Sequence, residues 1–202
     1  MKTALVLVDV INDFFHSEGI NYYSEYEPVL ENIKRVLAAA REYGILVVHT
    51  RERHIPDGHP DFEWRKLPEH CIEGSFAAQP VSGIEVLPGE YLVYKRRFSA
   101  FFATDLDLLL REAGVERLLV VGVKTNVCVR ATVQDAFGYG YDVSVVKDAI
   151  GSNLSHLHEA SLEDIERYMG NSITMEDAIQ MMKNDMTRTS VNYDSYSKEQ
   201  SS

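Results

Sequence analysis

Three side chains that can do chemistry each stand just beyond an apolar run of the sequence. Asp9 closes the first run, Lys95 ends a later one, and Cys128 follows a third within the segment 122–129. A thiolate is a nucleophile, a carboxyl group can move a proton, and an ammonium group stabilises negative charge. The thiol also stands where a predicted strand gives way to a helix, a position at which backbone N–H groups favour a thiolate and can bind an oxyanion.

Each of these residues, taken alone, also has a plainer interpretation. A free cysteine is commonly a small buried hydrophobe, so Cys128 alone does not decide between packing and catalysis. Asp9 can cap the following turn, and Lys95 can belong to a solvated basic cluster with Arg96 and Arg97. An aspartate that ends a fully apolar strand is costly to bury unless it is paired or used, which favours the functional interpretation of Asp9.

The elements that position these residues alternate between strand and helix. Such an alternation, with strands that are apolar on both faces, predicts βαβ units and a largely parallel sheet covered by helices on both sides. In an open parallel sheet, ligands bind beyond the carboxyl ends of the strands, where the strand order reverses. The predicted strands are Thr3–Val10, Ile45–Thr50, Tyr91–Lys95, Arg117–Val123 and Tyr141–Lys147, and the predicted helices are Pro28–Tyr43, Thr104–Gly114, Cys128–Tyr139, His156–Met169 and Met175–Met182.

Two segments interrupt this alternation. Residues His49–Pro88 form a long connection that holds four of the seven histidines. A loop of this length in a compact domain is usually functional or disordered, and its Phe62 and Trp64 favour an ordered one. The second segment, which begins near Asn184, is polar and rich in serine. We therefore expect residues 1–183 to form one domain and residues 184–202 to form a flexible C-terminal tail.

Three separated motifs, in this order, resemble those of the isochorismatase-like cysteine hydrolases, the superfamily of nicotinamidases and N-carbamoyl amide hydrolases. The matching segments are Leu7–Phe14, Lys95–Phe101 and Gly122–Val129, and the similarity runs from near Thr3 to near Ala178. The resemblance implies an α/β fold of the isochorismatase-like type. It has three layers, α/β/α, around a Rossmann-like parallel sheet of about six strands.

The resemblance also implies roles for individual residues. Cys128 attacks an amide carbonyl, Asp9 acts as the general base and acid, and Lys95 orients Asp9 and stabilises charge. A cis peptide bond is implied between Val123 and Lys124, with the backbone N–H groups of Lys124 and Cys128 forming an oxyanion hole. The implied reaction is hydrolysis of a carbon–nitrogen bond other than a peptide bond, through a thioester intermediate.

The long loop bears on whether a metal is bound. In nicotinamidases the corresponding loop supplies an Asp-x-His pair and a later His that bind a divalent metal, and here Glu52, His54 and His70 stand in similar positions. Two histidines and a carboxylate suit zinc or iron. Spacing alone does not choose between a metal ligand and a hydrogen-bond donor. The candidates for a fourth ligand are His59, Asp61 and Glu63.

Departures from the nicotinamidase pattern leave the substrate open. Glu52 stands where nicotinamidases have Asp, and Leu67 stands where they have Trp. The segment 49–54 also resembles that of metal-free relatives that act on biuret, ureidoacrylate or carbamoylsarcosine, in which loop residues contact the substrate directly. We expect Phe14 and Phe98 to line the substrate pocket, because small planar substrates favour aromatic contacts. No organic cofactor is expected.

Charge and composition narrow the range of partners. The formal net charge is −11, which argues against nucleic acid or an anionic membrane as the main partner. No apolar run approaches the ~20 residues of a membrane span. The two cysteines are too few for a disulfide framework, so a reducing cytoplasm is expected. The resemblance further implies a homo-oligomer that acts on a small-molecule amide.

The sequence therefore predicts a cysteine-dependent amidohydrolase that cleaves a small planar amide, as nicotinamidases do. The main alternative is a metal-independent amidohydrolase of ureides or N-carbamoyl compounds. An isochorismatase and a non-enzymatic binding protein are further alternatives. Isochorismatases proper lack the cysteine, and a retired site has no physical reason to keep Asp9, Lys95 and Cys128 together.

Overall fold

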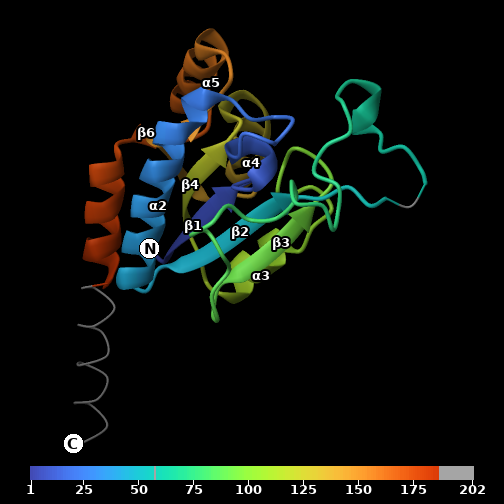
Figure 1. Cartoon of the computed structure of the whole chain (residues 1–202). Coiled ribbons are helices and arrows are strands. Elements are labelled where there is room, and N and C mark those ends of the chain that lie inside the picture. Colours follow the sequence, from blue (N-terminus) through green and yellow to red (C-terminus); the bar gives the residue numbers. More distant parts are fainter. Residues whose placement is uncertain (57, 187–202) are drawn as a thin grey trace, which may run out of the picture.

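The computed structural model describes residues 1–56 and 58–186. Within them, six parallel strands form one sheet in the order β3-β2-β1-β4-β5-β6 (Figure 1). This confirms the predicted α/β fold built on a parallel sheet. The strands are β1 (Thr3–Val8), β2 (Leu46–Glu52), β3 (Tyr91–Lys95), β4 (Arg117–Val123), β5 (Asp142–Gly151) and β6 (Asn171–Ile173).

Helices cover both faces of the sheet and complete the three layers. On one face, α2 (Glu27–Glu42) and a helical segment at 175–186 share a core with the sheet. On the other face lie α3 (Leu106–Glu112), α4 (Arg130–Gly138) and α5 (Ser155–Tyr168). The short helices are α1 (Asn12–Phe15), η1 (Ser24–Tyr26), η2 (Glu63–Arg65) and η3 (Thr125–Val129). No helix in the described part of the chain is long and apolar enough to cross a bilayer.

Strand β1 shows why this sequence forms a central parallel strand. All its residues are buried, and they alternate between the two cores: Leu5 and Leu7 join one, whereas Ala4, Val6 and Val8 join the other. A strand that is covered on both faces needs a continuous apolar run and no polar side. The apolar run of β1 ends at Val8, and the polar residue Asp9 follows it.

Apart from shifts of a few residues at the ends of elements such as β1 and β2, and from the short helices α1, η1 and η2, the structure differs from the prediction in three elements. Strand β5 runs on to Gly151, past the predicted end at Lys147. Strand β6 was not predicted, because Asn171–Ile173 is short and mostly polar. The predicted helix at Cys128–Tyr139 begins earlier, as a π-helix over Thr125–Val129, and becomes α-helical from Arg130. This wider first turn carries Cys128.

The strand order reverses between β1 and β4, which are neighbours at the centre of the sheet. Gly122, near the end of β4, has φ +119, and a Cβ atom there would lie 2.0 Å from the carbonyl oxygen of Val8. Only glycine permits this approach. The two strands therefore deliver Asp9 and Cys128 to either side of the position where parallel sheets bind ligands.

The long connection between β2 and β3 extends beyond the arrowhead of β2 in Figure 1. It returns to the sheet edge through two isolated bridges, a parallel one between His54 and Ile72 and an antiparallel one between Ile11 and Pro80. These bridges bring loop side chains over the carboxyl ends of the strands. Most of the C-terminal tail proposed for residues 184–202 lies outside the described residues, which end at 186.

Candidate active site

Asp9, Lys95 and Cys128 come together at the carboxyl ends of β1, β3 and β4, although β2 lies between β1 and β3. The Lys95 ammonium lies 2.8 Å from Oδ2 of Asp9 and donates to the Cys128 sulfur at 3.5 Å. All three residues are buried. A thiol, a carboxyl group and an ammonium group thus share one small volume, and they belong to the three residues that the sequence analysis selected.

The backbone fixes the direction of the Asp9 side chain. Asp9 has φ 54, a left-handed conformation that is uncommon for a residue with a side chain. Its N–H donates to the Thr50 carbonyl at 2.9 Å, and its Oδ1 accepts from the Glu52 N–H at 2.7 Å. One carboxylate oxygen is therefore held by β2, and the other faces Lys95.

Burial sets the protonation behaviour of this cluster. It raises the pKa of Asp9 against the opposing charge of Lys95. Burial also raises the pKa of the Cys128 thiol, and the nearby Lys95 offsets this only in part. For Lys95 the negative charges of Asp9 and its neighbours outweigh burial, and they hold its pKa well above the ordinary value. The helix start was expected to favour a thiolate, but in this fully buried position the thiol form is favoured until a base removes the proton.

The turn that carries Cys128 is held by its own contacts. The peptide bond between Val123 and Lys124 is cis. Thr125 follows at the start of the π-helix, is buried, and its hydroxyl lies 2.9 Å from Nδ1 of His158 on α5. The turn is therefore attached to α5 as well as to β4.

A cavity of about 170 Å³ opens onto the Cys128 sulfur. Phe14 and Phe98, the predicted pocket residues, both line it. This volume lies below the ~300 Å³ at the lower end of common ligand pockets, so the cavity suits a small molecule. The other lining residues are Asn21, Glu52, Leu67, His70, Lys124 and Val127.

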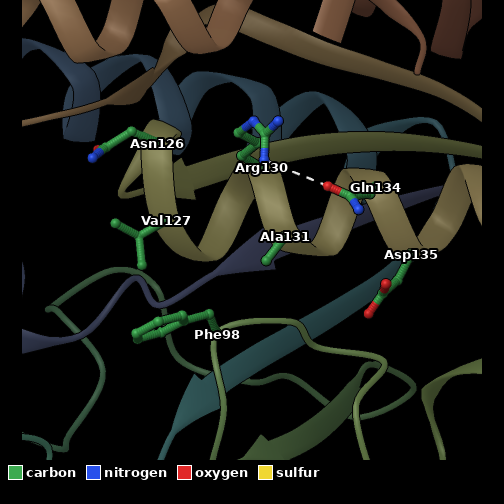
Figure 2. Close-up of a pocket in the computed structure, with 7 residues that line it drawn as sticks. All are labelled: Phe98, Asn126, Val127, Arg130, Ala131, Gln134 and Asp135. Atoms are coloured by element: carbon green, nitrogen blue, oxygen red, sulfur yellow. Dashed lines mark hydrogen bonds between the residues drawn. The ribbon is translucent and has the colours of Figure 1, made fainter. Parts of the chain in front are cut away.

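A second hollow of about 360 Å³ adjoins the first. Figure 2 shows Phe98 facing Val127 there, with Ala131 of α4 beside them. Phe98 and Val127 line both hollows, so they form the wall between them. Arg130, which lines the second hollow, already donates to Gln134 and to Asp164.

Carboxylates and histidines form a second cluster beside the cavity. Ligand atoms from Glu52, His54, Glu63 and His70 all lie within 4.8 Å of one another, and all four residues are buried. The structure thus brings together the three predicted metal ligands. Of the three candidates for a fourth ligand, the cluster contains Glu63 but neither His59 nor Asp61.

In both histidines Nδ1 lies close to an oxygen atom, and Nε2 faces Glu52. Nδ1 of His54 lies 3.1 Å from Asp61, and Nδ1 of His70 lies 2.7 Å from the Pro68 carbonyl. Nε2 of each histidine lies 3.5 Å from Glu52. A metal-binding histidine is typically oriented in this way by a second partner.

Asp61 belongs to the support of this cluster. It is buried and pairs with Arg96 at 2.7 Å and with Arg97 at 3.0 Å. The two arginines, interpreted in the sequence as a solvated basic cluster, instead hold the carboxylate that lies against His54. They lie far along the chain from Asp61, so sequence spacing gave no sign of this pairing.

The pKa values of the two carboxyl groups of the cluster are shifted in opposite directions. Burial would raise the pKa of Glu52, but Lys95 and the two histidines outweigh it and hold this pKa well below the ordinary value. Burial and the neighbouring Glu52 raise the pKa of Glu63 to about 8. The pair therefore carries one negative charge and one proton near neutral pH, in the absence of a cation.

Two cavity residues had no predicted side-chain role. Lys124 was considered only for its backbone N–H, yet its side chain lines the cavity. Asn21 was not considered, and it accepts a hydrogen bond from the Lys124 ammonium at 3.2 Å. The signal available in the sequence was a lysine placed directly between an apolar strand and the turn that carries Cys128.

A family model described as the isochorismatase domain matches residues 3–177. The chain belongs to the isochorismatase family. It is 34% identical to maleamate amidohydrolase of Pseudomonas putida, over 90% of this chain and 87% of the relative. It is 32% identical to the ureidoacrylate amidohydrolase RutB of Cronobacter sakazakii, over 84% of this chain and 83% of the relative.

The fold agrees with solved structures of the family. The nicotinamidase/pyrazinamidase PncA from Bacillus subtilis superposes with a TM-score of 0.81 at 27% identity, covering 86% of this chain and all of that one. The family resemblance read from the motifs is thus confirmed. So is the expected enzyme class, a hydrolase of carbon–nitrogen bonds other than peptide bonds.

Proposed function

We propose that this protein is a cysteine-dependent amidohydrolase that cleaves the carbon–nitrogen bond of a small planar amide through a thioester intermediate. The observation that carries the proposal is the meeting of Asp9, Lys95 and Cys128 at a cavity of about 170 Å³. The relatives named for maleamate and ureidoacrylate support a small amide as the substrate.

The first half of the reaction forms the thioester. Asp9 takes the thiol proton of Cys128, and the sulfur attacks the carbonyl carbon of the amide. The backbone N–H groups of Lys124 and Cys128 receive the negative charge that develops on the carbonyl oxygen. The carbon–nitrogen bond then breaks, and the leaving nitrogen takes the proton back from Asp9 to depart as ammonia or an amine.

The second half releases the acid. Asp9 removes a proton from a water molecule, and the resulting hydroxide attacks the thioester carbon. The carbon–sulfur bond breaks, the sulfur regains a proton, and a carboxylic acid leaves. The raised pKa of Asp9, caused by burial, suits a group that must accept a proton twice per cycle.

Lys95 keeps this cycle electrically balanced. Its ammonium contacts both Asp9 and the sulfur, so it faces a negative charge whether the proton is on Asp9 or on Cys128. A buried carboxylate or thiolate without such a partner would be strongly disfavoured. The three groups therefore titrate as one coupled set.

The cluster beside the cavity fits a divalent metal, for which we propose Glu52, His54 and His70 as ligands with Glu63 as the fourth. Glu52 Oε1, His54 Nε2 and Glu63 Oε2 are buried and have no hydrogen-bond partner in the described part of the chain. A bound zinc or iron ion would supply a Lewis acid that holds a polar atom of the substrate. Without one, Glu52 and His70 still reach the cavity as hydrogen-bonding groups.

Ammonia release across a panel of amides tests the proposal. The panel is nicotinamide, maleamate, ureidoacrylate, biuret and N-carbamoylsarcosine, each assayed with and without a chelator. We expect the wild type to release ammonia from at least one of them, and Cys128→Ala to release none. Failure of the whole panel, or wild-type release by Cys128→Ala, would contradict the proposal. Activity that survives complete metal removal would favour the metal-independent ureide branch.

A further inference from the structure

The side chain of Lys124 projects into the same cavity as the nucleophile. Lys124 follows β4 directly, and it lines the cavity of about 170 Å³ together with Cys128. Its ammonium donates to Asn21 at 3.2 Å and lies 5.9 Å and 5.5 Å from the ring centroids of Phe14 and Tyr23. One neutral acceptor and two aromatic rings thus surround it.

This ammonium group has no ion-pair partner among the described residues, although the carboxylates of Glu52 and Asp13 act on it from a greater distance. No ion pair of the described residues includes Lys124, whereas the other lysine of the site, Lys95, lies 2.8 Å from Asp9. The side chain of Lys124 is half-buried, and burial lowers its pKa. Removing an ammonium from water without a paired anion is unfavourable. An anion that enters with the substrate would supply the missing charge.

The rest of the cavity limits what such a substrate can be. Phe14, Leu67, Phe98 and Val127 give it apolar walls, and its volume admits only a small molecule. A small substrate with an apolar body and one anionic end therefore fits this cavity, with its anion beside Lys124.

We infer that Lys124 binds a carboxylate of the substrate, so that the preferred substrate is a short acid amide: an amide carbonyl for Cys128 and a carboxylate for Lys124, joined by a short flat apolar spacer. This inference rests on the proposed function and narrows its substrate class. Lys124 has two separate roles in this scheme, because its backbone N–H faces the oxyanion whereas its side chain selects the substrate.

A matched pair of amides tests the selection. Maleamate carries the carboxylate, and (Z)-but-2-enamide carries a methyl group in its place. For the wild type we expect kcat/KM to be higher for maleamate, and for Lys124→Met we expect the ratio of the two values to fall by about 10- to 100-fold, mainly through KM. Lys124→Arg should recover most of the ratio, because an arginine also pairs with carboxylates.

A surface lysine provides the control for net charge. Lys147 is exposed, and Lys147→Met removes the same charge away from the cavity. This variant should leave the ratio of maleamate to butenamide hydrolysis unchanged. A ratio that is equally insensitive to Lys124→Met, or a wild type that prefers the neutral amide, would overturn the inference.

Binding of maleate separates this inference from the proposed function. Calorimetric titration of maleate needs no turnover, and we expect its Kd to rise by about 10- to 100-fold in Lys124→Met. If no amide is hydrolysed but maleate binding depends on Lys124, the proposed function fails and the carboxylate site stands. If amides are hydrolysed but the Kd of maleate is the same in the wild type and in Lys124→Met, the carboxylate site is contradicted and the proposed function stands.

Discussion

The ammonium of Lys95 lies 2.8 Å from Oδ2 of Asp9, and neither side chain is exposed to solvent. Such a pair is held by mutual attraction against a large cost of desolvation, so removing one partner leaves a buried charge with nothing opposite it. The stability of the fold therefore depends on the charge balance of this pair, for which we also propose a catalytic role.

This dependence makes a prediction about stability. Lys95→Met should lower the free energy of unfolding by about 3–5 kcal/mol, because Asp9 is left as an unpaired buried carboxylate. The double variant Asp9→Asn, Lys95→Met should recover most of that loss, since both charges are gone. Neither variant should hydrolyse amides. Urea unfolding of the wild type, both single variants and the double variant measures the coupling, and purely additive losses would contradict the prediction.

The two cysteines should differ in reactivity although both are buried. Cys128 lines the cavity and contacts Lys95, so iodoacetamide can reach a sulfur whose thiolate is stabilised by a cation. Cys71 does not line that cavity, and its thiol donates to the Asp13 carboxylate at 3.2 Å. Burial raises the pKa of both thiols, but Lys95 offsets this in part at Cys128, whereas nearby carboxylates raise the pKa of Cys71 further.

Intact-mass labelling followed by peptide mapping should find Cys128 alkylated much faster than Cys71. Lys95→Met should slow the labelling of Cys128 and leave that of Cys71 nearly unchanged. Cys71→Ala serves as the matched control, and it should keep amide hydrolysis within about tenfold of the wild type. Equal labelling of both cysteines would remove the case for an activated nucleophile.

Binding of a divalent metal should release a proton from Glu63. Burial and Glu52 raise the pKa of Glu63 to about 8, so this carboxyl is protonated at pH 7 in the metal-free protein. A ligand must lose its proton to bind, and so the affinity for metal should increase as the pH rises toward 8 and then level off.

Calorimetric titration of Mn²⁺ or Zn²⁺ into chelator-treated protein measures this proton, when it is repeated in buffers with different ionisation enthalpies. Glu63→Gln should still bind metal, more weakly and with fewer protons released, and the pH dependence that remains between 6 and 8 belongs to His70, whose pKa burial would lower but Glu52 raises. An unchanged number of protons released by Glu63→Gln would assign the proton to another group. Absence of any metal binding by the wild type would contradict the metal site itself.

The sequence predicted most of the sheet because buried parallel strands leave a strong signal. A continuous apolar run such as Thr3–Val8, closed by Asp9, indicates both the strand and the end at which chemistry occurs. Strand β6 lacked that signal, because Asn171–Ile173 is short and lies at the sheet edge. The π-helix at Thr125–Val129 was not predictable either, since no residue pattern distinguishes its first turn from that of an α-helix.

The candidate site was predictable to the extent that its residues follow strands. Asp9 follows β1 and Lys95 ends β3, and the parallel arrangement brings both residues to the same edge of the sheet. Glu63 and Asp61 both lie in the long connection, and both come close to His54. Only the fold decides that Glu63 lies near Nε2 of His54, within the cluster, and that Asp61 lies near Nδ1, outside it. Spacing in a loop carries no such directional information, so the sequence left these two residues as equal candidates.

A last prediction concerns the pH dependence of the fold away from the cavity. Glu90 accepts from Arg41 at 2.7 Å and lies 2.9 Å from Nε2 of His49, and so it connects α2, β2 and the loop before β3. Burial would raise its pKa, but Arg41, the Leu87 N–H and His49 outweigh burial and lower this pKa from the ordinary value of 4.5 to about 2.

A carboxyl whose pKa is lower in the folded state contributes stability above its unfolded value, and this contribution is lost as the pH falls from 4.5 toward 2. The free energy of unfolding of the wild type, measured in urea between pH 7 and pH 3, should therefore decline below pH 4.5 more steeply than that of Glu90→Gln. At pH 7 Glu90→Gln should be the less stable of the two. Parallel curves for the two proteins would show that Glu90 titrates alike in the folded and unfolded chains, and that its contacts with Arg41 and His49 contribute no stability.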